Sequence, residues 1–334
     1  MKKNYFFIFL LFLLVSCKKD KLPQLSFYFW KTSFRLTDAE KNTLNENNVK
    51  KLYVRYFDVD LDSKTNKPYP NSAIKFYQTP NEFIIIPVVF IKNKVFLSKT
   101  VDIDLLSIKI IDFISQINSK NNIKISEIQF DCDWSINSKD NFLEFIKLVR
   151  KKSKIKISAT IRLHQVKYFK KLGVPNIYSG VLMYYNMGSI SALKGNSIYS
   201  KETAKNYLSS LKNYPLELKV ALPIFSWAIH IRDRKIVSLR NKINFKELKK
   251  DRNFTKVEEG FYKVLNSNYK EGIFYLKGDI LKLELITSEN LMEMTSDLSE
   301  NLKHTPSEII IYDLDNLNTK NYKNDIFSKI IKNF

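Results

Sequence analysis

Hydrophobic residues in this chain gather in short, β-rich runs that alternate with amphipathic segments. Eight of these runs have the length and composition of buried strands: Ser26–Trp30, Lys51–Phe57, Phe83–Phe90, Glu127–Asp133, Lys156–Leu163, Gly180–Tyr185, Leu218–Phe225 and Glu308–Leu314. Near-continuous apolar strands separated by helices are typical of parallel sheets. The pattern therefore predicts an α/β fold, and eight such units fit a (β/α)8 TIM-type barrel better than an open doubly wound sheet.

Capping signals and apolar periodicity predict the helices between these strands. The signals are a capping box of Thr37 with Glu40, the spaced residues Leu105, Ile108, Ile111 and Ile114, the stripe Phe142, Phe145, Ile146 and Val149 after Ser138, caps at Ser200 and at Thr255 with Glu258, and a helix from Ser288 to about Lys303. The segment Gly272–Ile286 does not fit the alternation. It predicts a small β-hairpin inserted before the last helix and strand.

The start of the chain has the pattern of a bacterial lipoprotein signal peptide. Two lysines precede eleven consecutive apolar residues (5–15), and the segment 14–17 (LVSC) matches the site where signal peptidase cuts before a cysteine that becomes lipid-modified. The apolar run is too short for an ordinary transmembrane helix, which disfavours an uncleaved anchor. We therefore expect a signal peptide at 1–16, a lipidated tether at 17–25 beginning with Cys17, and a single barrel domain at 26–334. This predicts a cell-envelope protein anchored to a bacterial membrane, with the outer membrane favoured.

The composition narrows the class of ligand. Without residues 1–16 the chain keeps 53 of its 55 Lys and Arg (55 − 2) against 34 Asp and Glu, a formal charge of +19. Such a charge suits anionic polymers or membrane surfaces. However, the lysines are spread along the chain rather than clustered with aromatic residues, so we favour a solvated lysine surface. A lipid-anchored chain with no recognisable nucleic-acid module is not expected to bind nucleic acid.

Cysteine, histidine and glycine usage argues against several kinds of site. If Cys17 carries lipid, Cys132 is the one cysteine left, so neither an internal disulfide nor a cysteine metal cluster is expected. The three histidines lie far apart in the sequence, and the seven glycines never form a G-x-G arrangement. The dinucleotide fingerprint and the phosphate-cradling loop are therefore absent from the sequence. We expect no metal and no organic cofactor.

The strand Glu127–Asp133 ends with two acids that face the same way. Neighbouring side chains on a strand alternate between its faces, so Asp131 and Asp133 share one face, and Cys132 and Trp134 share the other. Two acids at the carboxyl end of an apolar strand are unfavourable to bury without partners. Because catalytic groups of a (β/α)8 barrel lie at this end of the strands, the pair is a candidate for chemistry.

Other strands are expected to bring polar and aromatic side chains to the same rim. These are Trp30, Asp58, Arg162, His164, Tyr185, Asn186, Trp227 and Asp313, with Arg162 and His164 on the polar face of one strand. Aromatic faces stack on sugar rings while acids, amides and arginine hold hydroxyl groups, so this combination suits a carbohydrate site.

Each of these residues also has a structural interpretation. Asp131 beside Arg162 could be a buried ion pair inside the barrel. His164 could be a hydrogen-bonded structural histidine, and the two tryptophans could be packing residues. Asp313 and Asp315 could cap the final helix. Only the convergence of these residues on one rim favours a functional site.

Three segments resemble signature sequences of family 18 glycoside hydrolases, the chitinases and endo-β-N-acetylglucosaminidases. The fourth strand is similar to D-x-x-D-x-D-x-E, with Asp131 and Asp133 as its D-x-D core. The segment 183–186 (MYYN) is similar to M-x-Y-D, and 221–225 (ALPIF) looks like G-L-P-x-Y. The phrases SATIRLHQ, LMYYNMGS and ALPIFSW also resemble a family of lipoproteins from the Bacteroidetes. The resemblance covers strands four to seven, at the level of motifs.

The chain departs from the family pattern at three positions. Ile128 stands in place of the first aspartate, Ser135 in place of the acid glutamate, and Asn186 in place of the last aspartate of M-x-Y-D. The family's mechanism uses the substrate's own acetamido group as nucleophile. The resemblance implies that Asp133 and Tyr185 hold this acetamido group, so the proton for the leaving oxygen has to come from another side chain.

The sequence leaves the identity of that acid open. Asp131 is one candidate, because burial beside a second carboxylate raises the pKa of a carboxyl group. Asp58 and Asp313, across the predicted barrel, are the others.

Three functions are open at this point. The first is a lipid-anchored, glycoside-hydrolase-like monomer that acts on a glycan, with N-acetylhexosamine units implied by the resemblance. Its catalytic candidates are Asp131, Asp133 and Tyr185, and the remaining rim residues would bind the substrate. The second is a non-catalytic barrel that binds glycans or forms part of a surface assembly. The third is a structural lipoprotein whose rim residues are paired with one another.

Overall fold

The computed structural model describes residues 22–191, 195–241, 245–323 and 325–334. The predicted signal peptide at 1–16 and the predicted lipidation site, Cys17, lie outside the described residues. Within them, no helix combines the length and the apolar character needed to cross a membrane.

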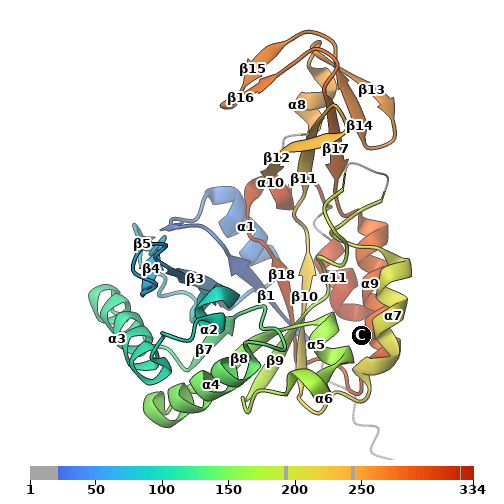
Figure 1. Cartoon of the computed structure of the whole chain (residues 1–334). Helices are drawn as coiled ribbons and strands as arrows, with labels where there is room; N and C mark the ends of the chain where they lie inside the picture. Colours follow the sequence, from blue (N-terminus) through green and yellow to red (C-terminus); the bar gives the residue numbers. More distant parts are fainter. Residues whose placement is uncertain (1–21, 192–194, 242–244, 324) are drawn as a thin grey trace, which may run out of the picture.

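Eight parallel strands form a closed barrel (Figure 1). They are β1 (Gln24–Phe29), β3 (Lys51–Leu61), β6 (Ile84–Ile91), β7 (Glu127–Asp131), β8 (Lys156–Arg162), β9 (Ser179–Met183), β10 (Leu218–Pro223) and β18 (Glu308–Tyr312). Strand β1 pairs with β18 on one side and with β3 on the other, which closes the sheet. Each strand overlaps one of the eight predicted runs, so the (β/α)8 barrel is confirmed.

Short strands extend the barrel at one side. Strand β4 (Pro68–Asn71) pairs antiparallel with the carboxyl-terminal part of β3, residues 58–61. Strands β2 (Ser33–Phe34) and β5 (Lys75–Phe76) form a separate two-stranded ladder.

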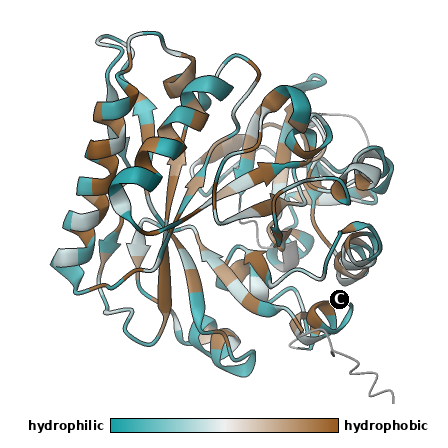
Figure 2. Cartoon of the chain, turned by 90° about the horizontal axis from the view of Figure 1, so that it is seen from below, coloured by the Kyte–Doolittle hydropathy of each residue, from teal (hydrophilic) through white to brown (hydrophobic). Residues whose placement is uncertain are grey.

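Helices surround the barrel, with apolar residues concentrated on the strands and on the helix faces that cover them (Figure 2). They are α1 (Asp38–Glu46), α2 (Asn93–Leu97), α3 (Ile103–Asn121), α4 (Lys139–Ser153), α5 (Leu163–Lys167), α6 (Phe169–Leu172), α7 (Lys201–Leu211), α9 (Ser288–Asn301), α10 (Asn316–Thr319) and α11 (Ile326–Lys332). The capping box at Thr37 and the cap at Ser200 are present as predicted, and Thr287 caps α9.

The predicted apolar face of α3 is only partly right. Leu105 and Ile108 are 46% and 37% exposed, whereas Ile114 is buried. Residues spaced strictly by three advance 300° per step and therefore drift around a helix of 3.6 residues per turn. The buried stripe instead runs through Leu106, Ile110, Ile114 and Ile117.

An insertion between β10 and α9 forms a second sheet above the carboxyl end of the barrel (Figure 1). Its strands are β11 (Trp227–Arg232), β12 (Lys235–Asn241), β13 (Phe254–Glu258), β14 (Phe261–Val264) and β17 (Ile280–Glu284), paired antiparallel in the order β12-β11-β17-β14-β13. Helix α8 (Phe245–Lys250) and the hairpin of β15 (Asn268–Lys270) and β16 (Ile273–Tyr275) complete it. The insertion therefore lies where a hairpin was predicted, but it is larger.

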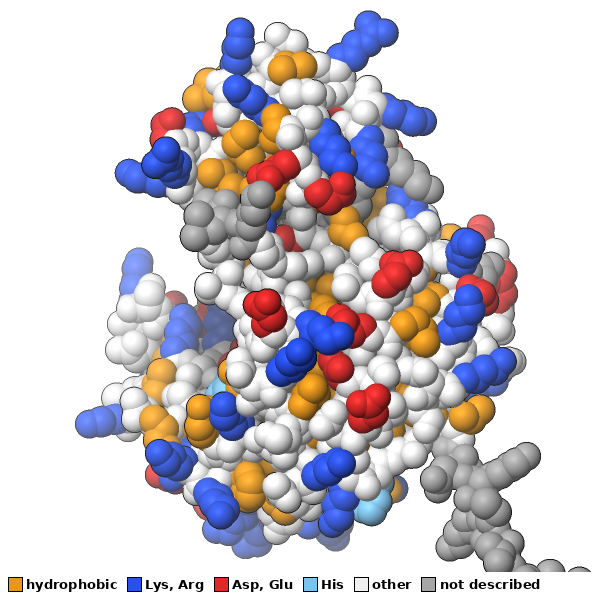
Figure 3. All heavy atoms as spheres, turned by 90° about the vertical axis from the view of Figure 1, so that its right-hand side faces the viewer, with side chains coloured by type: hydrophobic (Ala, Val, Ile, Leu, Met, Phe, Trp, Pro, Cys, Tyr) orange, Lys and Arg blue, Asp and Glu red, His pale blue; other side chains and the backbone are white. Residues whose placement is uncertain are grey.

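The insertion overturns one predicted helix. Thr255 and Glu258, read as a helix cap, lie in strand β13, where Thr255 pairs with Lys263 of β14. Gly260, with a φ of 77°, lies in the turn between β13 and β14, so the chain reverses there and cross-strand pairing determines the local structure. Figure 3 shows the insertion as a lobe set off from the barrel by a hollow, with lysine and arginine side chains spread over both parts.

A charged network fills the amino-terminal end of the barrel interior. Lys219 Nζ lies 3.3 Å from Glu127 Oε2 and 3.1 Å from Glu308 Oε2, and it donates to Tyr53 Oη at 2.8 Å. Lys51 Nζ also pairs with Glu308 Oε2, at 2.9 Å. Burial acts to lower the pKa of Lys219, but the two carboxylates outweigh it and raise that pKa above its usual value. These pairs compensate the burial of charge at the base of the barrel.

The network gives a stability prediction. Replacing Lys219 by Met (Lys219→Met) leaves Glu127 buried without a cation, so we expect the free energy of unfolding to fall by about 3–5 kcal/mol in urea titrations. The control is Lys256→Met, which removes an exposed lysine from its pair with Glu259 on the insertion. The control should change the free energy much less than Lys219→Met does, because water screens an exposed ion pair. Equal, small effects of the two substitutions would contradict this role for Lys219.

Candidate active site

Asp131 and Asp133 follow the alternation predicted for the end of β7. Asp131 is 5% exposed inside the barrel, while 46% of the Asp133 side chain is exposed above it. Trp134 points the other way, against helix α4, where its ring stacks on Phe142 with 4.5 Å between ring centroids. Cys132 is buried on that same side of the chain by the alternation. Both acids thus turn away from the outer helices.

Strand β8 supplies the partners of both acids. Thr160 Oγ1 donates a hydrogen bond of 2.7 Å to Asp131 Oδ1. The Arg162 guanidinium binds Asp133 through two bonds, from Nε to Oδ1 and from Nη2 to Oδ2, the second 2.9 Å long. The ion pair anticipated for Asp131 is therefore made by Asp133, because the exposed acid meets the end of β8, where Arg162 lies.

The two acids have different electrostatic surroundings. Burial raises the pKa of Asp131 to about 6, and the nearby charge of Asp133 adds to this effect. The charge of Arg162 and the hydrogen bond from Thr160 oppose the rise. Burial acts to lower the pKa of Arg162, but its bonds with Asp133 raise that pKa above its usual value. Asp131 is thus a carboxyl group that can hold or release a proton close to neutral pH.

Tyr185 lies deep in the barrel within a row of aromatic rings. Its ring stacks on Tyr312 with 5.5 Å between centroids, and Phe225 meets it edge-on at 5.9 Å. Its hydroxyl is buried and has no hydrogen-bond partner among the residues that the structure describes. The same is true of the Nε2 amide of Gln129, whose Oε1 accepts a bond of 2.7 Å from Tyr28. Two buried hydrogen-bond donors without a partner among the described residues are therefore available in the interior of the barrel.

A second arginine–aspartate pair lies beside this row. Arg55 Nε donates to Asp58 Oδ1 at 2.7 Å, and its guanidinium lies over the Trp30 ring at 5.7 Å. Residues three apart on a regular strand face opposite sides, but β3 carries a bulge between Arg55 and Phe57 that restores the common side. Asp58 is buried, and its charge acts on Asp131.

Three predicted rim residues, His164, Asn186 and Asp313, follow the ends of their strands. His164 is wrongly placed on the β8 face: the strand ends at Arg162, and His164 lies in the first turn of α5, exposed to solvent. Loss of hydration, together with the charge of Arg162, lowers its pKa. Asn186 follows β9 in an exposed, left-handed conformation with a φ of 55°. Asp313 is buried and accepts a 2.6 Å bond from Asn318.

The capping interpretation holds for Asp315, which accepts a 2.8 Å bond from the backbone N–H of Leu317 at the start of α10.

Trp227 joins the aromatic row from the insertion. It is half-buried at the start of β11, and its ring lies 5.2 Å from that of Phe225. Its indole Nε1 donates to Glu284 Oε2 at 2.8 Å. Trp227, Phe225, Tyr185, Tyr312 and Trp30 therefore form a continuous row across the carboxyl end of the barrel.

Ser135, in the position of the family's acid glutamate, is held by the loop that precedes α4. Its hydroxyl lies 3.3 Å from that of Ser138 and accepts a bond of 3.4 Å from the Asn93 amide. A hydroxyl group is no general acid near neutral pH. This position therefore supplies no proton donor.

Several residues of the site were missed from the sequence. Tyr312 and Gln129 face inward by strand alternation, so the parity of β18 and β7 could have indicated them. Thr160, the partner of Asp131, was missed as well, although it lies two residues before Arg162 on β8 and therefore shares its face. Glu284 gave no signal, because the strand order of the insertion cannot be read from the chain.

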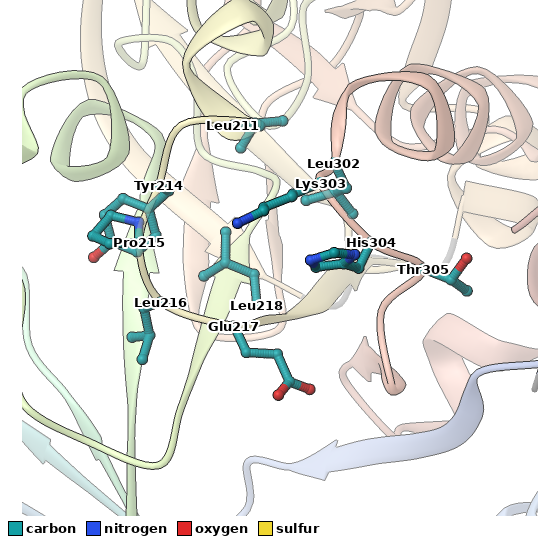
Figure 4. Close-up of a pocket in the computed structure, with 10 residues that line it drawn as sticks. All are labelled: Leu211, Tyr214, Pro215, Leu216, Glu217, Leu218, Leu302, Lys303, His304 and Thr305. Carbon is teal, nitrogen blue, oxygen red and sulfur yellow. The ribbon is translucent and has the colours of Figure 1, made fainter. Parts of the chain in front are cut away.

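A separate pocket of about 450 Å³ lies at the opposite end of the barrel (Figure 4). It is lined by the segments that precede β10 and β18, including Leu216, Glu217, Lys303 and His304. None of the predicted site residues lines it. The site is thus defined by the converging side chains at the carboxyl end and not by this cavity.

Solved structures of chitinases and related proteins have folds similar to that of this chain. The spore cortex-lytic enzyme SleL of Bacillus cereus aligns at 13% identity and a TM-score of 0.58, over 94% of this chain and 75% of that one. A chitinase of Chromobacterium violaceum aligns at 11% identity and 0.54, over 93% and 98%. A chitinase-like agglutinin of Robinia pseudoacacia aligns at 12% identity and 0.51, over 92% and 98%.

These likenesses establish the fold: the chain forms a barrel like those of family 18 chitinases, which are among the matching structures. No protein-family model matches the chain. No curated protein sequence matches it either.

The raised pKa of Asp131 predicts a pH-dependent stability. A carboxyl with a pKa near 6 in the folded chain and about 3.9 in the unfolded chain stabilises the fold below about pH 4, and this contribution is lost as the pH rises through 6. The substitution Asp131→Asn removes the ionisation. The free energy of unfolding of this variant, relative to that of the parent, should therefore rise by about 1–3 kcal/mol between pH 4 and pH 8.

The measurement is chemical denaturation of both proteins at each pH. The control is Asp140→Asn, which changes an exposed acid of α4. The difference in free energy of unfolding between this control and the parent should not change with pH. If the difference in free energy of unfolding between Asp131→Asn and the parent also stays constant with pH, Asp131 has an ordinary pKa.

Proposed function

We propose that this chain is a membrane-anchored, glycoside-hydrolase-like protein that acts on a glycan containing N-acetylhexosamine units. The observation that supports it most is the meeting of Asp131, Asp133, Arg162 and Tyr185 at the carboxyl end of a (β/α)8 barrel. The named neighbours add weight, since one is a chitinase and another a spore cortex-lytic enzyme. Both names describe action on a polymer.

The positions of the side chains suggest how an N-acetylated sugar would be held. Asp133 is exposed at the rim and Arg162 is half-buried beside it, and this pair would bind the sugar's amide and hydroxyl groups. The buried hydroxyl of Tyr185, which has no partner among the described residues, would donate to the acetamido oxygen. The aromatic row that ends in Trp227 would provide a stacking surface. Asp58, Asp313, Trp30, His164 and Asn186 complete the proposed substrate-binding set.

Asp131 is our candidate for the general acid, because its pKa of about 6 keeps it partly protonated near neutral pH. In the proposed reaction the acetamido oxygen bonds to the anomeric carbon as the bond to the leaving oxygen breaks. The proton of Asp131 passes to that leaving oxygen. Water then opens the cyclic intermediate and returns a proton to Asp131.

A second candidate function, glycan binding without cleavage, is favoured by a specific observation. Ser135 stands where the family has its acid. Asp131 is only 5% exposed and accepts a hydrogen bond from Thr160, so a substrate has little access to it. A chitinase-like agglutinin among the neighbours has a fold of this kind. In this case the rim would recognise the glycan, and no side chain would deliver the proton.

Assays on a defined oligosaccharide test both candidates. With chitotetraose as the probe, reducing ends measure turnover, and isothermal titration measures binding. For the hydrolase, Asp131→Asn should lower turnover by about 100-fold or more while binding is retained. Asp133→Asn should weaken binding, because it breaks the pair with Arg162. The control Asp140→Asn should change neither.

The variant Ser135→Glu separates the two candidates. A binding protein that lacks only its acid should gain turnover when a carboxyl group is restored at this position. A hydrolase that uses Asp131 should already be active without it. Absence of both binding and turnover in all these proteins, tested also on chitin and peptidoglycan fragments, would refute the glycan proposal.

The lipoprotein pattern at residues 1–17 supports a proposal for the location of the protein in the cell. We propose that signal peptidase cuts before Cys17 and that lipid on this cysteine anchors a monomeric barrel, residues 26–334, to a membrane of the cell envelope, with the outer membrane favoured. The substitution Cys17→Ser should move the protein from the membrane fraction to the soluble fraction of a bacterial host and abolish labelling by a palmitate analogue. Membrane association and labelling that survive the substitution would contradict the anchor.

A further inference from the structure

The base of the insertion contains a buried carboxylate directly opposite the tryptophan of the aromatic row. Trp227 and Glu284 are cross-strand partners in the antiparallel pairing of β11 with β17. The indole Nε1 of Trp227 donates to Glu284 Oε2 at 2.8 Å. Glu284 is 1% exposed, so its carboxylate is held away from solvent.

The other bonds of Glu284 join the insertion to a loop of the barrel. Its Oε2 also accepts from the backbone N–H of Ser197 at 3.0 Å and from the Ser197 hydroxyl. Its Oε1 lies 2.6 Å from Lys282 Nζ, and this lysine in turn donates to the carbonyl of Ser191 at 3.1 Å. Ser191 and Ser197 both belong to the segment between β9 and α7. One carboxylate therefore holds an indole, a barrel loop and a buried lysine.

The groups that Glu284 holds lead to the proposed glycan site. The Trp227 ring lies 5.2 Å from Phe225, which in turn meets Tyr185 at 5.9 Å. The carbonyl of Ser197 accepts a 3.1 Å bond from the backbone N–H of Gly188, two residues beyond Asn186. A buried Trp N–H usually has a hydrogen-bond partner. Without its carboxylate partner the indole would lose the bond that fixes its orientation.

We propose that Glu284 is a positioning residue that fixes the indole of Trp227 and the backbone at Ser197, and thereby shapes the glycan-stacking surface. This inference rests on the proposed function for the role of the surface in binding. The positioning of the indole itself does not depend on any ligand. Glu284 acts through Trp227 and touches no substrate.

The first experiment monitors the environment of the Trp227 indole by fluorine NMR in the absence of ligand. The full chain labelled with 5-fluorotryptophan carries three tryptophans, and Trp227→Phe identifies the resonance of Trp227 in fluorine NMR. Glu284→Ala should shift or broaden that resonance and leave the Trp134 resonance unchanged. Glu284→Gln keeps a carbonyl acceptor and should give a smaller change. The control Glu271→Gln alters an exposed acid of the same insertion and should change nothing.

The second experiment measures coupling through chitotetraose binding. Glu284→Ala should weaken the affinity about tenfold in the parent chain and less than about twofold in the Trp227→Ala background, because the two residues act as one unit. Glu284→Gln should recover most of the affinity.

The outcomes separate this inference from the proposed function. An unchanged Trp227 resonance in folded Glu284 variants, or an equal loss of affinity in both backgrounds, overturns the positioning role. Loss of the fold in Glu284→Ala, seen by circular dichroism, leaves the decision to Glu284→Gln. A parent chain with no affinity for chitotetraose refutes the assumed glycan, and the fluorine spectra alone then decide the role of Glu284.

Discussion

The polar ladder between β7 and β8 is the constraint on which the carboxyl end of the barrel depends. Alternation turns Glu127, Asp131 and Asp133 inward, and Ser158, Thr160 and Arg162 meet them in the same order along the neighbouring strand. A shift of one residue in either strand would turn these groups toward the apolar helices. The unfavourable burial of unpaired polar groups thus fixes the register, and the register places Asp131 below Asp133.

That ladder explains why the two acids differ. Asp133, at the open end, is paired with an arginine and partly exposed, whereas Asp131, one residue pair lower on the strand, accepts a bond from the neutral hydroxyl of Thr160. Burial then raises the pKa of Asp131 into the range where a proton can be exchanged near neutral pH. Asp131 is therefore a carboxyl group suited to proton transfer, although Ser135 stands where the resemblance to family 18 glycoside hydrolases implies an acid. Its depth within the barrel is the strongest argument for binding without cleavage.

The sequence was sufficient for features set by local periodicity. All eight barrel strands, the stripe of α4 and the inward turn of the acids follow from alternation and helical spacing. Features that depend on contacts between distant segments could not be predicted from the sequence. Thr255 and Glu258 satisfied a capping pattern yet lie in a strand, and His164 continued an alternation that stops where α5 begins. The pairing of Arg162 with Asp133 depends on β7 and β8 being neighbours, and the contact of Glu284 with Trp227 depends on β11 and β17 being neighbours.

The central claim is that the carboxyl end of the barrel is a glycan site. A crystal structure of the protein grown with chitotetraose tests it most directly. The account predicts sugar density in contact with Asp133 and Arg162 and stacked along the aromatic row that ends in Trp227. Sugar bound only in the pocket at the opposite end of the barrel, or an empty carboxyl end at saturating ligand, would contradict it.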